Sequence, residues 1–319
     1  MSQARPSAIE PGTTIYGTED LAEDTRGSLV VARGAKIMAA ACRWRQSCSP
    51  PWRSATPDRS PWTTTSSGAA SSSSAKRGST TIPPTCRGNG FLETEGGTDY
   101  VAREIEGFPT GGAAGTLIRY GGIHDDDNSG VFAYVSIRYG GYIFDPVNNS
   151  EINGLTLGCV GNETEIHHVE VFNNADDGIE FFGGTVDVHH MVMAFNEDDC
   201  YDIDEGYRAS VPCCHPEARQ EQLRWRARWG GSPQKNLQPF ATPHFTMRLT
   251  SDRGRRRLRR YQNGFHLRDN FAGQYCNSVF HDFKGFFVTV DNNADMTQRI
   301  NDGTCSSLSI TPSVCSVLD

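Results

Sequence analysis

A segment of 21 residues recurs 22 positions further along the chain, and this repeat restricts the fold more than any other feature. Residues 164–184 read TEIHHVEVFNNADDGIEFFGG, and residues 186–206 read VDVHHMVMAFNEDDCYDIDEG. The identical pairs are His167/His189, His168/His190, Asn174/Asn196, Asp176/Asp198, Asp177/Asp199 and Gly184/Gly206. The apolar positions are also in phase, and short runs rich in Val, Ile and Phe are typical of strands. The repeat therefore predicts an all-β solenoid of stacked coils, each about 22 residues long.

The alternation of side chains along a strand assigns the inner and outer faces of each coil. In the first strand Val169 and Val171 point inward and Glu170 points to solvent. In the second strand Ile179 and Phe181 point inward. The outward positions of the second strand and of its counterpart in the next coil, with the aspartates of the turns before them, form an acidic stripe. Its members are Asp177, Glu180, Asp198, Asp199, Asp202 and Asp204. We expect Glu180 to lie near Asp202, so that like-charge repulsion raises the pKa of at least one carboxyl group.

The repeated asparagines and histidines each have a structural interpretation. Asn174 stacked on Asn196 predicts a ladder of side-chain amides in the turn. His167 and His168 are interpreted as outward or turn-facing polar residues that recur because the coil recurs. A role as metal ligands is the alternative, and it requires a converging carboxylate or cysteine that the spacing does not fix.

Two segments differ in composition from the patterned sequence around them. The first 42 positions of residues 41–90 contain a single residue from the set Val, Ile, Leu, Phe and Tyr, and residues 209–260 contain eleven arginines. Together the two segments hold all five tryptophans and a formal charge of +15, whereas the whole chain carries −8. This composition indicates GC-rich DNA translated in a wrong frame; flexible linkers and basic arms for nucleic acid are the alternatives. We therefore predict no nucleic-acid partner.

These composition breaks divide the chain into six parts. The parts are N-terminal β-helix coils (1–40), an irregular segment (41–90), central coils (91–208), an irregular Arg-rich segment (209–260), C-terminal coils (261–301) and an irregular tail (302–319). We expect both irregular segments to be out of frame or disordered.

The ten cysteines predict neither a metal cluster nor an assigned disulfide framework. Five lie in the two atypical segments and two in the tail, and no Cys-x-x-Cys occurs. Cys213-Cys214-His215 lacks the second ligand pair of a zinc site. No apolar run reaches the length of a membrane-spanning helix, so no transmembrane segment is predicted. The first residues, MSQARPSAIEPG, lack the apolar stretch of a secretory signal.

An acidic loop precedes one of the predicted strands. Asp125, Asp126 and Asp127 lie in the sequence HDDDNSG, which ends on Gly130. Hard oxygen ligands in a short loop suit Ca²⁺, the one cofactor that the sequence suggests. The spacing differs from that of an EF-hand, and a solvated acidic turn is the alternative.

Four stretches resemble a family of secreted bacterial right-handed β-helix proteins, most of which have no assigned function. The stretches are IEPGTTIYG (9–17), GSLVVARGAKIMA (27–39), ADDGIEFFGGTVDVHH and NEDDCYDIDEGYR. The resemblance implies a right-handed parallel β-helix located outside the cell or in the cell envelope. In that family the phrase GAKIMA continues into another strand and a Trp-Gly-Gly coil, whereas here it runs into CRWRQSCSPPW.

A second resemblance is to polygalacturonase-type pectin hydrolases, which carry Asn-Thr-Asp on one coil and Asp-Asp, often followed by Cys, on the next. The positions that match are Asp177, Asp198 and Asp199, with Asp202 beside them. Ala175 replaces an asparagine of that pattern, and neither Gly-His-Gly nor Arg-x-Lys follows. The substitutes that the chain offers for those basic residues are His266 and Arg268. Glycosidic cleavage needs one protonated and one ionised carboxyl group, which crowded carboxylates supply by driving their pKa values apart.

These observations favour a secreted or cell-surface β-helix that binds extended acidic or neutral glycans or has a structural role. The alternative is a glycoside hydrolase or polysaccharide lyase of the pectin-degrading type that uses the paired aspartates. The sequence leaves open whether the protein is an enzyme, and it leaves the oligomeric state open.

Overall fold

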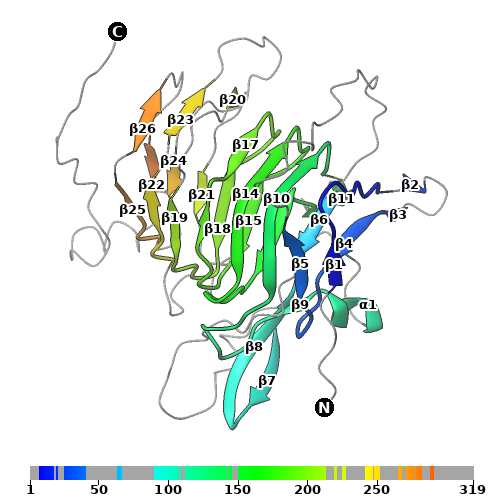
Figure 1. Cartoon of the computed structure of the whole chain (residues 1–319). Helices are drawn as coiled ribbons and strands as arrows, with labels where there is room; N and C mark the ends of the chain where they lie inside the picture. Colours follow the sequence, from blue (N-terminus) through cyan, green and yellow to red (C-terminus); the bar gives the residue numbers. More distant parts are fainter. Residues whose placement is uncertain are drawn as a thin grey trace, which may run out of the picture.

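The computed structural model consists mainly of short parallel strands that lie side by side along one direction (Figure 1). The residues that it describes are 7–17, 19–20, 25–40, 63–66, 90–106, 108, 112–141, 143–145, 150–212, 219–220, 225–227, 241–246, 248–251, 265–267, 271–276, 278–281 and 288–290. Within these residues there is one helix, α1 (Gly112–Leu117). It is too short to cross a membrane.

The largest sheet has eight parallel strands, each from a different part of the chain. In spatial order they are β4 (Ser28–Val30), β6 (Thr63–Ser66), β13 (Leu155–Gly158), β15 (Ile179–Phe182), β18 (Tyr201–Asp204), β21 (Trp225–Ala227), β24 (Phe265–Leu267) and β27 (Val288–Val290). Because paired strands are parallel, the chain must cross back after each strand to the end of the sheet where the next strand begins, as the repeat predicts.

A second sheet divides at its long strand β14. Its strands are β1 (Ser7–Ile9), β5 (Ile37–Ala40), β10 (Gly130–Arg138), β14 (Glu165–Phe172), β16 (Val188–His189) and β17 (Val192–Ala194). The first half of β14 pairs with β16 and the second half with β17. Beyond them lie two parallel three-stranded sheets: β19 (Ser210–Pro212), β22 (His244–Thr246) and β25 (Gln274–Tyr275), and β20 (Arg219–Gln220), β23 (Arg248–Ser251) and β26 (Val279–His281). Since β16 contacts β19 and β17 contacts β20, each half of β14 begins its own run of strands.

The register confirms the in-phase alignment of the two repeated segments. Ile166 pairs with Val188, and Glu180 pairs with Asp202, each 22 positions further along. Elsewhere the spacing is longer, as between Ser136 of β10 and its partner Glu170, which are 34 positions apart. The 22-residue period therefore describes the two central coils and not the chain as a whole.

The side chains assigned to the interior form one continuous core. Val171, Ile179 and Phe181 are fully buried, as are Met193 and Ile203 in the next coil. Burial of an aliphatic side chain of this size stabilises the fold by about 1.5–3 kcal/mol. The predicted inward faces of both strands are therefore confirmed.

Three corners of the coil are marked by residues with positive φ. The sets that stack on one another are Tyr134/His168/His190, Tyr139/Asn173/Phe195 and Cys159/Gly183/Glu205. Each non-glycine residue in this conformation costs about 1–2 kcal/mol. The corner amides offset part of this cost by continuing the ladder between coils, as in the bonds from Asn173 N to Ala194 O (2.8 Å) and from Cys159 N to Phe182 O (2.9 Å).

An antiparallel unit lies against the outer side of the eight-stranded sheet. It consists of β7 (Phe91–Glu95), β8 (Thr98–Glu104) and β9 (Arg119–Tyr120) with helix α1, and we call it the cover. Ile105, Ile118 and Tyr120 of the cover form a second apolar cluster with Cys159 and Phe182 of the sheet. Two further antiparallel pairs are β2 (Glu19–Asp20) with β3 (Thr25–Arg26), and β11 (Ile143–Asp145) with β12 (Ser150–Glu151).

Strands are present within both segments that we expected to be irregular. In residues 41–90, β6 pairs in parallel with β4 and β13. In residues 209–260, β21 joins β18 to β24, and β19, β20, β22 and β23 also pair with neighbouring strands. Backbone hydrogen bonds to adjacent coils do not require the repeat's side chains, so short strands can form in these segments. Most other residues of both segments, and all of the tail, lie outside the described residues, so the six-part division stays a prediction.

Candidate functional site

The repeated aspartates lie in the turns that lead into β15 and β18. The Asn174 side chain donates to the carbonyl oxygen of Asp177 (2.8 Å), and its backbone N–H donates to Asn196 Oδ1 (3.1 Å). The Asp177 carboxylate accepts a hydrogen bond from the backbone N–H of Asp199 (2.7 Å). The Asn196 side chain thus holds the two turns in register by accepting from the backbone of Asn174, which differs from the predicted ladder between side-chain amides.

The acidic stripe is buried except for the half-buried Asp198, which corrects the expectation that it faces solvent. Glu180 and Asp202 are each 1% exposed, and Asp177 and Asp199 are also buried. The alternation of faces is right, because Glu180 lies on the side of the sheet opposite to the core residues Ile179 and Phe181. This outer face is the one on which the cover packs.

Burial changes the protonation of these carboxyl groups. The pKa values of Asp177 and Glu180 are raised well above their ordinary range, first by loss of solvent and then by neighbouring carboxylates. For Glu180 these neighbours include Glu106 of the cover as well as the predicted Asp202. Repulsion therefore contributes as expected, but burial is the larger cause.

Carboxylate oxygens converge in two overlapping groups of three. One group is Asp176, Asp177 and Asp198, the other is Asp177, Glu180 and Asp202, and the oxygens of each group lie within 4.8 Å of one another. Asn153 donates a short hydrogen bond to Glu180 from the side of β13. Hard oxygen ligands of this kind suit a divalent cation such as Ca²⁺.

The cover is fixed to the sheet by charged contacts at the end of β18. Arg103 of β8 forms an ion pair with Glu205, and the Tyr120 hydroxyl donates to the other carboxylate oxygen of Glu205 (2.9 Å). Within the cover, Glu93 pairs with Arg119 at 3.2 Å and with Arg33, which follows β4, at 2.7 Å. These contacts hold the cover on the outer face of the eight-stranded sheet.

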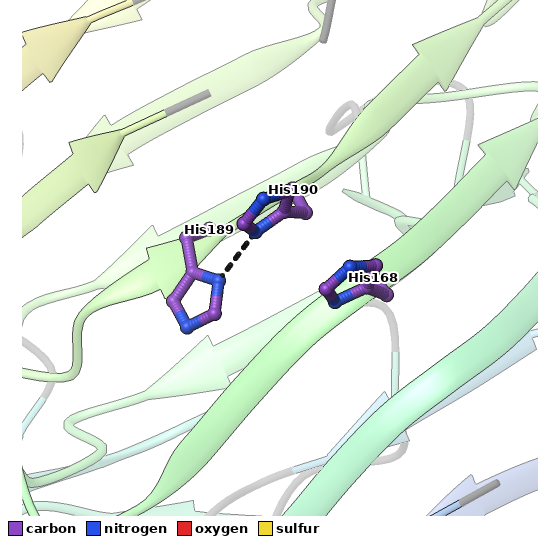
Figure 2. Close-up of side chains that lie close together, drawn as sticks. All are labelled: His168, His189 and His190. Atoms are coloured by element: carbon purple, nitrogen blue, oxygen red, sulfur yellow. Dashed lines mark hydrogen bonds between the residues drawn. The ribbon is translucent and has the colours of Figure 1, made fainter. Parts of the chain in front are cut away.

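Four histidines gather at the first corner of the coil. His168 stacks on His190 with ring centroids 4.3 Å apart and an interplanar angle of 8°. His167 stacks on His189 at 5.0 Å and 19°. Figure 2 shows His189 and His190 joined by a hydrogen bond, with His168 next to them on β14. Partial burial and the neighbouring His167 and His190 lower the pKa of His189.

Comparison with known proteins gives one match. A family model described as a pectate-lyase-like β-helix domain matches residues 107–314. The chain belongs to this family. No curated protein and no solved structure matches it. Membership in the pectate-lyase-like family supports a parallel β-helix and fits a role outside the cell that is directed at pectin-related glycans.

The structure of this pectate-lyase-like domain brings together four of the five proposed catalytic residues. Asp177, Asp198, Asp199 and Asp202 lie in the two adjacent turns and in β18. His266 lies in β24 and pairs with Arg226 of β21. Arg226 in turn pairs with Asp202 of β18. Two strand spacings, about 9.6 Å, therefore separate His266 from Asp202. Arg268 lies outside the described residues.

The predicted calcium loop has a different arrangement in the structure. Asp125 pairs with Arg208 (3.0 Å), and Asp127 accepts a hydrogen bond from the Ser129 hydroxyl (3.0 Å). The Asp125 carbonyl oxygen also accepts from the Thr185 hydroxyl (2.6 Å). The loop thus connects β10 to the turn after β15, and Ca²⁺ binding by Asp125, Asp126 and Asp127 stays a prediction.

Sequence reasoning missed an aromatic row at the second corner of the coil, where β10, β14 and β17 end. Tyr139 packs edge-on against Phe172 with centroids 6.0 Å apart, and Phe172 packs edge-on against Phe195 at 5.2 Å. Arg138 lies over the Phe172 ring and pairs with Glu170. The signal in the sequence was an aromatic residue at or beside the same corner of each coil.

Proposed function

We propose that this protein is an extracellular glycan-binding β-helix whose binding face is the aromatic row Tyr139–Phe172–Phe195. The observation that carries the proposal is this row beside a guanidinium and a carboxylate on the outer face of the sheet. Aromatic rings give extended contact area at a low entropic cost, and nearby polar groups fix orientation. Membership in the pectate-lyase-like family supports a glycan as the ligand.

The chemistry of the row suits an acidic polysaccharide. Arg138 is half-buried, and its guanidinium is held by Glu170, which also accepts from the Ser136 hydroxyl (2.6 Å). A guanidinium binds planar carboxylates through two parallel hydrogen bonds. A uronate carboxylate that approaches Arg138 would compete with Glu170, while the sugar ring lies on Tyr139, which is 42% exposed.

Catalysis by the paired aspartates is the alternative function. The raised pKa of Asp177 favours it, because a general acid must hold its proton near neutral pH. However, Asp177 and Asp199 are buried and the cover packs over the outer face of the sheet beside them. A general acid must lie within hydrogen-bond reach of the glycosidic oxygen. We therefore propose binding without cleavage.

The proposal is tested by titration calorimetry with polygalacturonate oligomers and with a neutral glucan as comparison. We expect Tyr139→Ala to weaken binding of the preferred glycan at least tenfold, because it removes an exposed ring of the row. Tyr16→Ala is the matched control, since Tyr16 is an exposed tyrosine in the loop after β1. Equal affinity of a folded Tyr139→Ala variant and the unchanged protein would overturn the proposed face.

A further inference from the structure

The backbone at the first corner places both members of each histidine pair on the same side of the chain. Neighbouring residues of an extended strand point to opposite faces. His168 and His190, however, have φ values of 51° and 55°, which turn the chain at the second histidine of each pair. As a result the rings of His167 and His168 lie 4.9 Å apart, and those of His189 and His190 lie 5.0 Å apart.

Stacking of coils then brings the two pairs together. His168 lies on His190 and His167 lies on His189, as adjacent rungs of the same sheet. The Tyr134 ring stacks on His168 at 4.4 Å and covers the group on the side of β10. Ring nitrogens of His168, His189 and His190 lie within 4.8 Å of one another.

A chain of hydrogen bonds determines which nitrogen of His168 carries a lone pair. Glu165 Oε1 lies 2.7 Å from His167 Nε2, and His167 Nδ1 lies 2.9 Å from His168 Nδ1. An ionised Glu165 accepts the proton of His167 Nε2, so neutral His167 has its lone pair on Nδ1 and accepts from His168 Nδ1. Neutral His168 therefore has its lone pair on Nε2. A carboxylate–histidine chain of this kind orients the histidine ligands of metal sites.

We propose that His168, His189 and His190 bind one divalent transition-metal ion, with Zn²⁺ as the preferred probe, and that Glu165 and His167 position His168 for it. Imidazole nitrogens are ligands for Zn²⁺, Ni²⁺ and Cu²⁺. In a tetrahedral zinc site two ligand nitrogens lie about 3.4 Å apart, as follows from Zn–N bonds of about 2.05 Å. The three rings are half-buried, so water takes the fourth position.

The ion takes the place of a proton that two imidazoles share. His189 Nδ1 and His190 Nδ1 are 2.7 Å apart, and one of them donates its proton to the other. When the metal binds, the donating ring moves its proton to its own Nε2 through solvent, and both Nδ1 lone pairs face the ion. The two nitrogens separate by about 0.7 Å to reach the spacing of a tetrahedral site, which small rotations of the rings provide.

The test uses the full chain without an added histidine tag. Titration calorimetry with Zn²⁺ is expected to give one site per chain, while Ca²⁺ gives none at this site because imidazole is a poor ligand for it. His189→Gln, and His168→Asn or His190→Asn, should each weaken Zn²⁺ binding at least tenfold. Asn is chosen at the two corner positions because it tolerates positive φ. His244→Gln is the matched control, since His244 is exposed in β22.

Two further measurements separate the metal site from a purely structural histidine stack. Glu165→Gln should weaken Zn²⁺ binding by about tenfold, as loss of an outer-shell carboxylate does in other sites, without lowering the melting temperature of the metal-free protein. Visible absorption of bound Co²⁺ should change in the three ligand variants and stay the same in His244→Gln. Absence of a stoichiometric Zn²⁺ site in the folded protein, or equal affinity in all three ligand variants, would overturn the proposal.

Discussion

The Tyr120 hydroxyl donates a 2.9 Å hydrogen bond to Glu205, and this contact joins the cover to the third corner of the coil. Glu205 also pairs with Arg103, so one carboxylate holds two strands of the cover. Tyr120 itself is 3% exposed and packs against Phe182 with ring centroids 5.7 Å apart. The contact therefore links apolar packing and charge at the same point of the fold.

Removal of this hydroxyl is expected to loosen the cover. Tyr120→Phe keeps the packing on Phe182 but removes a hydrogen bond to a charged acceptor, which is worth about 1.5–3 kcal/mol. We expect the free energy of unfolding to fall by about that amount and amide hydrogen exchange of β8 to become faster. Tyr139→Phe is the control, because Tyr139 lies exposed at another corner. Unchanged exchange of β8 in Tyr120→Phe would show that apolar packing alone holds the cover.

The core register makes opposite predictions for two neighbouring residues. Val171→Asp should unfold the central coils, because an unpaired charge in the core costs several kcal/mol. Glu170→Lys should cost about 1 kcal/mol or less, since it removes only a partly exposed pair with Arg138. Urea unfolding followed by circular dichroism measures both changes. A stable Val171→Asp variant would contradict the assigned register.

The buried carboxyl groups predict a specific dependence of stability on pH. Because the pKa of Glu180 is raised in the folded protein, the folded state binds more protons than the unfolded state between the ordinary pKa and the raised one. The contribution of Glu180 to stability is therefore lost as the pH rises through this window. Glu180→Gln should stabilise the protein by at least about 1 kcal/mol at pH 8 and change little at pH 4.

Denaturant titrations at the two pH values provide the measurement for Glu180→Gln. Glu163→Gln is its control, because Glu163 is exposed. Equal effects of Glu180→Gln at pH 4 and pH 8 would contradict a pKa of Glu180 that is higher in the folded than in the unfolded protein.

A close approach of two coils predicts the effect of a single methyl group. Gly130 has a φ of 106°, and an added Cβ atom would overlap the carbonyl oxygen of Ile37 in β5. We expect Gly130→Ala to destabilise the protein by about 3 kcal/mol or more, measured by thermal unfolding. Gly34→Ala shares the positive φ but has open space around it, so it should lose only about 1 kcal/mol. Similar losses in both variants would show that β5 and β10 can move apart.

The binding proposal predicts no release of reducing ends from polygalacturonate, with calcium or with chelator. We expect no cleavage because Asp177, Asp199 and Asp202 are buried and cannot reach a polysaccharide chain. Cleavage that is lost in a folded Asp199→Asn variant would contradict binding without catalysis. It would instead support the hydrolase or lyase alternative, with the cover moving away from the sheet.

The repeat in the sequence predicted which side chains of the central strands lie in the core and which residues of successive coils pair. Val171 and Met193 are buried and paired because residues at the same position of successive coils occupy the same rung. The burial of Glu180 was not predicted, because it depends on packing at the outer face by residues of the cover that are far away in sequence, namely Ile105, Ile118 and Tyr120. The cover is antiparallel and lacks the repeat, so its docking on the eight-stranded sheet left no periodic signal.

The repeat also predicted part of the candidate site. The sequence placed Asp177 and Asp199 in equivalent turns, and the hydrogen bond between them confirms that arrangement. The convergence of the repeated histidines was not predicted, because it depends on the positive φ of His168 and His190, which the pattern of apolar residues does not encode. Strand alternation alone would have put His167 and His168 on opposite faces.

The unequal spacing of paired strands has a consequence for how such a protein acquires new surfaces. Glu180 and Asp202 are 22 positions apart and Ser136 and Glu170 are 34 apart, yet each pair meets on adjacent strands of the same sheet. Extra residues are thus accommodated in the connections while the rungs keep their alignment. The cover, inserted between β6 and β10, is one such excursion. Ancestral lengthening of a single connection would suffice to seal or uncover a face without altering the interior, so relatives on this scaffold are expected to differ most in their connections.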